Sequence, residues 1–415
     1  MEIIDELKRR LVERVDITND ISDEELMGII SSLVNEKYSR SVVPVSKRLS
    51  TVRELFNSIR GLDILQDILE DSSVTEIMIN GPDDIFIERE GLLYRYPGSF
   101  SSREKLGDII QTIASRANKR VNESSPILDT RLPDGSRVNI VLRPIALNGP
   151  VITIRKFSRS VMSMNDLVRR ASITAEASEF LKELVRCGYN IFISGGTGSG
   201  KTTFLNALSD HIPKDERIIT IEDSAELQLS GLENLVVLEC RQANTEGDNE
   251  VTMRDLIKAS LRMRPSRIIV GEVRGPEALD MLQAMNTGHD GSLSTGHANS
   301  PEGMLSRLET MVLTGADMPL DAIKRQISSA LDVIVHLERV SGGERMVSEI
   351  TEVLDMENGA YRLNCLYRLE DGPGRGLCLK KTANSLHNNL KLRRKDGSWR
   401  EVRVDDSTGS ENLVR

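Results

Sequence analysis

The sequence predicts an α/β domain with a mostly parallel sheet, preceded by a smaller α+β domain and a helical N-terminal segment. Three observations support this fold class. After Thr174, short apolar runs rich in β-branched residues alternate with helical patterns, which is typical of a parallel sheet. The stretch ISGGTGSGKTTFLNAL (193–208) has a glycine loop between an apolar strand and a helix. From about Val74 the hydrophobic period changes from helical to two, as in antiparallel strands.

Residues 1–60 read as helices. Apolar residues recur at helical spacing in MEIIDELKRRLVERVD, and Ser22 with Glu25 forms a capping box before LMGIISSLV. A third, short helix is expected to follow Thr51, because Thr51 and Glu54 repeat the capping pattern. We interpret this region as a docking or packing element.

Residues 61–157 form the predicted α+β domain. VTEIMIN (74–80), DIFIERE (84–90) and LLYRY (92–96) alternate with period two and suggest a small antiparallel meander with a turn at Gly91. A helix with one apolar face follows around residues 106–117, and VNIVLRP (138–144) and VITIRKF (151–157) read as further strands. The polar and small residues of 158–173 suggest a linker.

Residues 174–369 form the predicted α/β domain. Five apolar runs read as strands, and helical patterns lie between them: NIFIS, RIITIED, LVVLEC, RIIVGEV and SLSTGHA. VIVHLERV, MVSEITEVL and AYRLNCLYRL then suggest a terminal meander. Residues 370–415 turn polar and glycine-rich, so we expect a poorly ordered tail.

Charge and cysteine content exclude several classes of protein. There are 54 Lys and Arg against 63 Asp and Glu, for a formal net charge of -9, and aromatic residues make up 3%. We therefore expect no nucleic-acid partner, because strand-tracking surfaces are basic and bear aromatic side chains. Four scattered cysteines suit reduced thiols. The start has no apolar signal-peptide core, and no run approaches the ~18 residues of a membrane span, which favours a cytoplasmic location.

The glycine loop satisfies GxxxxGKT and predicts a phosphate-binding loop. Backbone N–H groups of such a loop approach the phosphates, and the following helix offers its positive end. We expect Lys201 to reach the β and γ phosphates and the Thr202 hydroxyl to bind Mg²⁺. The predicted nucleotide-binding residues are Gly195, Gly196, Thr197, Gly198, Ser199, Gly200, Lys201, Thr202 and Thr203.

Hydrolysis also needs a carboxylate that activates water. Glu272 follows the strand RIIV and is our candidate general base, since a strand-end carboxylate can lie beside the γ phosphate. Gly271 stands where many P-loop ATPases have a Walker B Asp, so other groups must complete the metal site. Glu222, Asp223 and Glu226 supply carboxylates at the end of RIITIED, with Asp223 reaching the metal through water; a solvated loop or a helix start is the alternative.

His289 and His297 lie eight residues apart in TGHDGSLSTGHANS, around a predicted strand. Two of the five histidines in one Gly/Ser/Thr-rich segment suggest a loop that senses the γ phosphate. The alternative is that each histidine is an ordinary structural residue with its hydrogen bonds satisfied.

Taken together, these motifs closely resemble the CpaF family, the tight-adherence (Flp) pilus ATPases within the type II/type IV secretion ATPase superfamily. The residues that carry the resemblance span about Ile64 to Leu369: VTEIMINGPDDIFIE, LPDGSRVN, GGTGSGKTT, IITIEDSAEL and LRMRPSRIIVGEVRGPEALDMLQAMNTGHDGSLSTGHANSP. By this resemblance IEDSAEL is the Asp box, RIIVGEVRG an atypical Walker B that lacks the usual Asp, and TGHDGSLSTGHANS the His box. The tail after about Glu370 departs from the family pattern.

The resemblance implies a hexameric ring of subunits, each with a PAS-like N-terminal domain and a RecA-like motor domain, that binds ATP with Mg²⁺ between its two domains. It implies a partner, a polytopic platform protein of the inner membrane that serves a pilin system, and so a peripheral position at the cytoplasmic face. Arg137 and Arg155 match arginines that face nucleotide phosphates within or across subunits; solvated strand arginines are the alternative. Rival hypotheses are a conjugation-type secretion ATPase, a RecA-like nucleic-acid motor and a nucleotide-gated scaffold without turnover.

Overall fold

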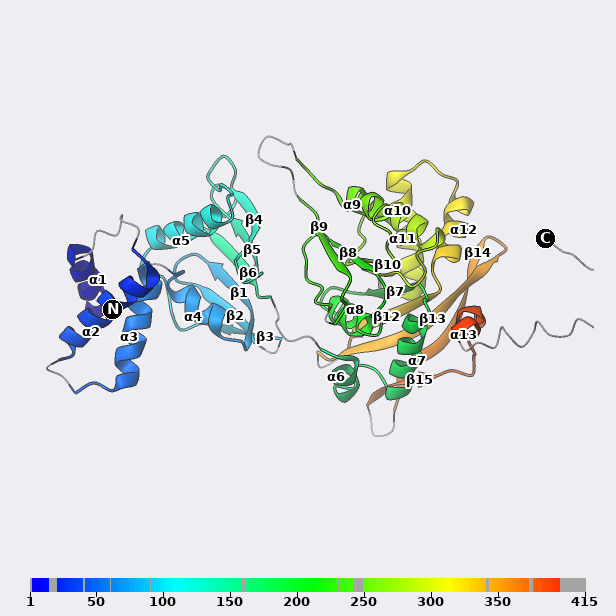
Figure 1. Ribbon diagram of the computed structural model, residues 1–415, viewed down its shortest axis with the longest axis horizontal. Helices are drawn as coiled ribbons and strands as arrows, with labels where there is room; N and C mark the ends of the chain where they lie inside the picture. Colours follow the sequence, from blue (N-terminus) through cyan, green and yellow to red (C-terminus); the bar gives the residue numbers. More distant parts are fainter. Residues whose placement is uncertain are drawn as a thin grey trace, which may run out of the picture. The chain divides into compact units, whose positions relative to one another are not determined.

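The computed structural model describes residues 2–14, 21–39, 42–59, 61–89, 91–157, 162–229, 231–241, 243, 249–340, 343–372 and 376–395. The chain divides into two compact units, Met1–Arg159 and Ser160–Arg415, and each is considered by itself. Figure 1 labels their elements and colours them from the N-terminus (blue) to the C-terminus (red). Within the described residues, no helix combines the length and the apolar character that crossing a bilayer requires.

Three helices begin the first unit: α1 (Glu2–Arg14), α2 (Asp23–Lys37) and α3 (Val45–Ile59). Their buried leucines, including Leu7, Leu11 and Leu33, pack into one small core. The predicted capping box at Ser22 is present. The expectation of a helix starting after Thr51 is wrong, because Thr51 is buried inside α3 and its hydroxyl donates to the Lys47 carbonyl at 2.9 Å. A threonine that bonds back to a carbonyl within its own helix cannot cap it.

The rest of the first unit is an α+β fold. Its six-stranded sheet has the order β3-β2-β1-β6-β5-β4, and every pairing in it is antiparallel. The predicted meander and helix are present, whereas α4 and β4 were not predicted. The elements are α4 (Ile64–Glu70), β1 (Val74–Asn80), β2 (Ile85–Arg89), β3 (Leu92–Arg95), α5 (Arg103–Arg116), β4 (Ile127–Arg131), β5 (Arg137–Val141) and β6 (Val151–Arg155).

The second unit is built on a nine-stranded sheet with the order β15-β14-β13-β12-β7-β11-β10-β8-β9. The part of the sheet that runs from β12 through β7, β11, β10 and β8 to β9 is parallel, as predicted. Strands β13, β14 and β15 continue the sheet beyond β12 with antiparallel pairings. The strands are β7 (Ile191–Gly195), β8 (Ile218–Glu222), β9 (Leu235–Glu239), β10 (Arg267–Val270), β11 (Leu293–Gly296), β12 (Val333–Arg339), β13 (Arg345–Glu357), β14 (Ala360–Asp371) and β15 (Leu377–Lys381).

Helices cover both faces of this sheet (Figure 1). Residues of α6, α7 and α8 pack into the core of one face, and residues of α9 to α12 into the core of the other. The central strands are buried on both sides, which explains their continuous apolar sequences. The helices are α6 (Met164–Arg169), α7 (Ala175–Arg186), α8 (Lys201–Ser209), α9 (Met253–Ser260), α10 (Glu277–Asn286), α11 (Pro301–Gly315), α12 (Leu320–Ala330) and α13 (Leu390–Lys395).

Two interpretations of the chain's organisation need correction. The segment 158–173 was read as a linker, yet it contains α6, whose Met164 and Leu167 are buried in the second unit's core. The segment 370–415 was read as a poorly ordered tail, yet β14 extends to Asp371, β15 pairs with it, and α13 follows. Trp399 and the other residues after 395 lie outside the described part of the chain.

Candidate nucleotide-binding and hydrolysis site

The glycine loop lies between β7 and α8, as the sequence predicted. Gly200 caps the helix in a left-handed conformation with φ of 94°, which glycine adopts without strain. A Cβ on Gly195 would collide with the Leu337 carbonyl oxygen of β12, the neighbouring strand. Glycine is therefore required at both ends of the loop, once for its backbone angle and once for close packing. Thr202 and Thr203 follow in the first turn of α8.

Lys201 is 7% exposed and folds back over its own loop. Its Nζ donates to the carbonyl oxygens of Gly195 at 3.1 Å and Gly196 at 2.9 Å, and lies 3.2 Å from Nδ1 of His297. Burial lowers the pKa of Lys201, and Glu272 acts in the opposite direction. A buried ammonium held only by neutral acceptors is poised to bind an anion.

A chain of polar contacts runs from Lys201 to Arg274. Nε2 of His297 lies 2.7 Å from Oε1 of Glu272, and Nη2 of Arg274 donates to Oε2 of Glu272 at 2.6 Å. Because Nδ1 of His297 faces an ammonium, we assign its proton to Nε2, which faces the carboxylate. Burial first, and then the charge of Lys201, lower the pKa of His297, so the imidazole is neutral at pH 7.

Glu272 is the centre of this chain. Burial acts to raise its pKa, but the Arg274 hydrogen bond and the charges of Arg274 and Lys201 outweigh burial, so its pKa lies below the usual value. Its Oε1 is buried and has no hydrogen-bond partner among the described residues, although Nε2 of His297 lies 2.7 Å away. The ionised carboxylate thus has an oxygen available to accept a proton or a water hydrogen bond.

The Glu222 side chain fills the space that is left because Gly271, the residue before Glu272, has no side chain. A Cβ on Gly271 would lie 2.7 Å from Cγ of Glu222, so only glycine fits there. The Glu222 side chain is buried and accepts backbone N–H bonds from Glu226 at 2.8 Å and Leu227 at 3.1 Å. Glu222 therefore orders the acidic loop, while Asp223 is half exposed and lies 4.0 Å from Arg274.

His289 lies apart from this cluster. It precedes β11 whereas His297 follows it, and β11 is parallel to β7, so His289 is at the sheet edge opposite the glycine loop. Its ring Nδ1 lies 3.1 Å from the Ala284 carbonyl near the end of α10. The prediction that both histidines belong to one γ-phosphate-sensing loop is therefore wrong within this unit.

Arg137 and Arg155 belong to the first unit. They are directly opposite one another in the pairing of β5 with β6, and Arg131 of β4 is directly opposite Arg137. Strand pairing thus sets three arginines in one cross-strand row. No sequence motif marks Arg131 or Arg274 as a site residue, although Arg274 stands only two residues after Glu272.

Comparison with known proteins decides the family. The model of the family described as "Type II/IV secretion system protein" matches residues 59–365. The chain belongs to this family. It is 34% identical over 323 residues to "Conjugal transfer protein TrbB" of Rhizobium radiobacter, covering 77% of this chain and 95% of that protein. It is 33% identical over 318 residues to "Type IV secretion system protein VirB11" of Brucella suis, covering 70% of this chain and 88% of that protein.

Among solved structures, the crystal structure of the pilus retraction motor PilT with bound ADP matches with a TM-score of 0.52 at 17% identity. The match covers 82% of this secretion-family chain and 88% of the PilT chain. At that identity the likeness concerns the fold alone. The narrower resemblance to the CpaF subfamily is not decided by these matches.

The donor set of this secretion-family chain fits Mg²⁺ held largely by substrate. No group of three or more His, Cys, Asp or Glu among the described residues forms a ready-made metal cage. Mg²⁺ commonly keeps several waters and binds through one or two protein ligands together with substrate phosphates. The Thr202 hydroxyl at the start of α8 and the half-exposed Asp223 are suitable ligands, the second through water.

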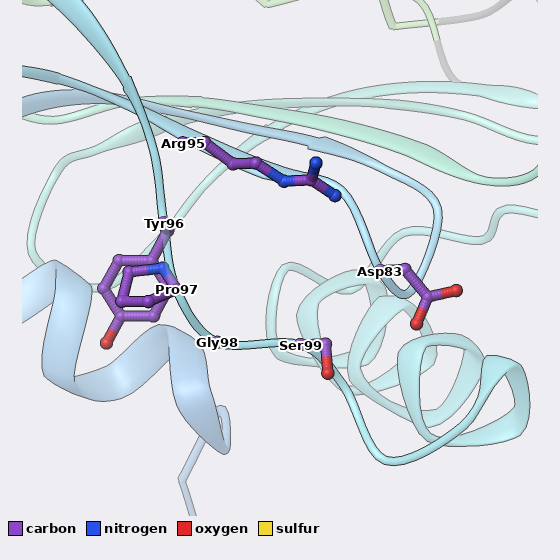
Figure 2. Close-up of a pocket in the computed structure, with 6 residues that line it drawn as sticks. All are labelled: Asp83, Arg95, Tyr96, Pro97, Gly98 and Ser99. Atoms are coloured by element: carbon purple, nitrogen blue, oxygen red, sulfur yellow. The ribbon is translucent and has the colours of Figure 1, made fainter.

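A separate open pocket of about 390 Å³ lies in the first unit of this family member. Figure 2 shows that the Arg95 guanidinium points toward the turn that carries Asp83, with Tyr96 beside Pro97. Arg95 is ion-paired with Asp84 at 2.6 Å. None of the predicted site residues lines this pocket, so it is not the nucleotide site.

Proposed function

We propose that the chain is a Mg²⁺-dependent ATP hydrolase that powers transport through a membrane-bound secretion or pilus machine. The observation that carries this proposal is the contact chain Lys201–His297–Glu272–Arg274 at the mouth of the glycine loop. It combines a phosphate-binding cation with an ionised carboxylate that has an available oxygen. These are the two requirements of in-line attack by water on a γ phosphate.

Each residue has a distinct task in this reaction. The loop N–H groups and Lys201 bind the β and γ phosphates, so Lys201 exchanges its carbonyl contacts for phosphate oxygens. Glu272 orients the attacking water through Oε1 and accepts its proton. Arg274 and neutral His297 keep Glu272 ionised and correctly turned. Thr202 and, through water, Asp223 would hold Mg²⁺, which would supply positive charge to the phosphates.

The assembly belongs to the same proposal. We infer a homo-hexameric ring in which a RecA-like motor domain and a PAS-like first domain close on ATP. Arg137 and Arg155 then stabilise the transferred phosphate from the first domain, which couples hydrolysis to domain movement. The motif order of the sequence and the likeness in fold to a pilus motor support this assignment.

The pathway proposed first is assembly or retraction of a Flp-type pilus. The order of the Asp box, the Walker B segment GEVRG and the His box TGHDGS supports it. The partner would be a polytopic platform protein, and the ring would sit at the cytoplasmic face of the inner membrane. A second candidate, conjugal or type IV secretion, is favoured by the names of the relatives that are 33 and 34% identical.

Hydrolysis is tested by phosphate release from the purified chain with ATP, with and without Mg²⁺. We expect turnover that requires Mg²⁺ and is abolished in Lys201→Ala, because phosphate binding is lost. GTP in place of ATP measures base selectivity. Nucleotide binding without phosphate release, in every assembled form of the chain, would favour the nucleotide-gated scaffold instead.

The pathway is tested by deleting the gene in its natural host and restoring it with the parent or the Lys201→Ala chain. The pilus hypothesis predicts loss of surface pilin, restored only by the parent. Normal piliation together with loss of plasmid transfer or protein secretion would move the chain to the second candidate.

A further inference from the structure

The C-terminal end of β12 lies beside the glycine loop. In the parallel pairing of β12 with β7, His336 lies opposite Ser194 and Leu337 opposite Gly195. Oγ of Ser194 is 2.8 Å from Nδ1 of His336, and both side chains are buried. This contact fixes the end of β12 against the base of the loop. Strand β12 then continues three residues beyond His336, to Arg339.

Strand alternation sets the direction of two arginines on this hairpin. Leu337 and Val347 are directly opposite and are buried in the core that contains Phe204 and Leu205 of α8. Arg339 and Arg345 are also directly opposite, and each lies two residues from Leu337 or Val347 on its own strand, toward the turn. Because side chains two residues apart share a face, both arginines project on the side of the sheet that α8 covers.

A direct contact bears out this placement for Arg345. Its Cδ lies 3.4 Å from the position that a Cβ would take on Gly200, the residue immediately before Lys201. The aliphatic stem of Arg345 therefore packs against the last glycine of the loop. A long charged side chain commonly buries its stem in this way and keeps its charged end free.

Arg339 and Arg345 set two positive charges directly opposite one another, and the exposed Glu338 and Glu344 adjoin them along the chain. Arg339 and Arg345 are exposed, and neither guanidinium makes a hydrogen bond or an ion pair in the described part of the chain. Like charges directly opposite on neighbouring strands destabilise the pairing. Lys201 and the N-terminus of α8 add further positive potential at the same edge. An anion bound between these groups would relieve the repulsion.

We propose that Arg345 is a further phosphate-binding residue of the nucleotide site, with Arg339 adding to its positive field. This inference rests on the proposed function and adds a residue from outside the predicted motifs. Guanidinium groups bind phosphate through paired hydrogen bonds. A stacking contact with the base is less consistent with the opposed charges, because a neutral base would leave their repulsion in place.

The test measures binding of ADP, inorganic pyrophosphate and adenosine to the purified full chain by calorimetry. The variants are Arg345→Gln, Arg345→Lys and the matched control Arg362→Gln. Arg362 is an exposed arginine on β14 in the same sheet, paired at 3.7 Å with exposed Glu357. We expect Arg345→Gln to weaken ADP and pyrophosphate by about tenfold each, Arg345→Lys by less, and the control not at all.

The melting temperature and the pattern of ligand binding distinguish an error in this inference from an error in the proposed function. The melting temperature of the nucleotide-free Arg345→Gln chain should not fall below that of the parent, since glutamine keeps the side chain as far as Cδ, which packs against Gly200, and removes only the repelling charge. If the parent binds ADP and Arg345→Gln binds it equally well, the inference is wrong while the proposed function stands. Weaker adenosine binding with unchanged pyrophosphate binding would also overturn it. Absence of ADP binding by the parent would contradict the proposed function itself.

Discussion

At the scale of single residues, Gly271 shows how a missing side chain shapes the site. Its hydrogen leaves room for Glu222, whose carboxylate then caps the backbone of the acidic loop. Gly271→Ala should displace Glu222, cost about 1–3 kcal/mol in the free energy of unfolding and reduce ATP turnover. Urea titration and phosphate release measure the two effects.

The control for that substitution is Gly107→Ala. Gly107 lies inside α5, and no atom stands within 4 Å of a Cβ built on it. Alanine there should stabilise its unit by about 0.5–1 kcal/mol, because glycine is a poor helix former. A Gly271→Ala chain as stable as the parent would show that Glu222 is not confined as the structure indicates.

One buried and two partly buried histidines should make the second unit sensitive to mild acid. Burial lowers the pKa of His211, His297 and His336 below the ordinary value of 6.5. The unfolded chain therefore binds more protons than the folded chain just below pH 6.5, and stability falls as pH drops from there toward the lowered pKa values. The paired carboxylate Glu272, whose pKa is also lowered, loses its stabilising effect only below about pH 4.5.

His336→Asn tests this account, since asparagine can still accept the Ser194 hydrogen bond but does not titrate. Glu338, Glu349 and Glu302 are the acids that act on His336, and they oppose the effect of burial without reversing it. Melting temperature between pH 7 and pH 5 should fall less in His336→Asn than in the parent. His387→Asn, on an exposed side chain, serves as control; an identical slope in His336→Asn and the parent would refute the argument.

At the scale of elements, α13 is held by contacts that are remote in sequence. Nζ of Lys391 lies 2.8 Å from Oδ2 of Asp332 and 2.9 Å from Oδ1 of Asp290, and the Tyr189 hydroxyl donates to the carbonyl of Asn388. Burial raises the pKa of Asp332, and Lys391 opposes that rise. Lys391→Met should leave Asp332 buried without its cation and cost about 2 kcal/mol, measured by urea unfolding.

Lys380→Met provides the comparison, because Lys380 and Glu370 form an exposed pair on neighbouring strands. Its loss should change stability by less than about 1 kcal/mol. Equal effects of the two substitutions would mean that α13 is not docked through Lys391.

The same contacts explain which elements the sequence could predict. Strands β7, β8 and β10 have apolar runs that identify them locally, and Ser22 and Glu25 mark the start of α2. The sequences of β15 and α13 are short and basic, and their order comes from pairing with β14 and from residues near Tyr189. The prediction that Thr51 starts a helix is wrong because its hydroxyl donates to a carbonyl within α3. No window of the sequence contains such distant partners.

The site residues also divide into those that local sequence identifies and those whose position depends on partners elsewhere in the fold. Glu272 and His297 stand just after the ends of β10 and β11, and Lys201 follows the glycine loop that leaves β7, so the parallel topology predicted that they would meet. Arg274 was missed because its position depends on pairing with Glu272. His289 was misassigned because β11 separates it from His297, and the sequence motif does not show that the two lie at opposite ends of that strand.

At the scale of the whole molecule, two units with separate cores should unfold separately. The first unit is held by its sheet core and its helical core, and the second by the cores on the two faces of its sheet. Calorimetry should resolve two transitions. ADP at about 100 times its Kd should stabilise the second unit by about 2.7 kcal/mol and leave the other transition in place. Equal shifts of both transitions would indicate that the units unfold as one.

The central claim is that Glu272 activates the water that attacks ATP. Its most direct test compares phosphate release by the parent, Glu272→Gln and the control Glu239→Gln, where Glu239 is the exposed register partner of Glu222 at the same edge of the sheet. We expect at least about a 100-fold loss of turnover in Glu272→Gln, with ATP still bound, and a rate near that of the parent in the control. Equal rates in the parent and Glu272→Gln would contradict it.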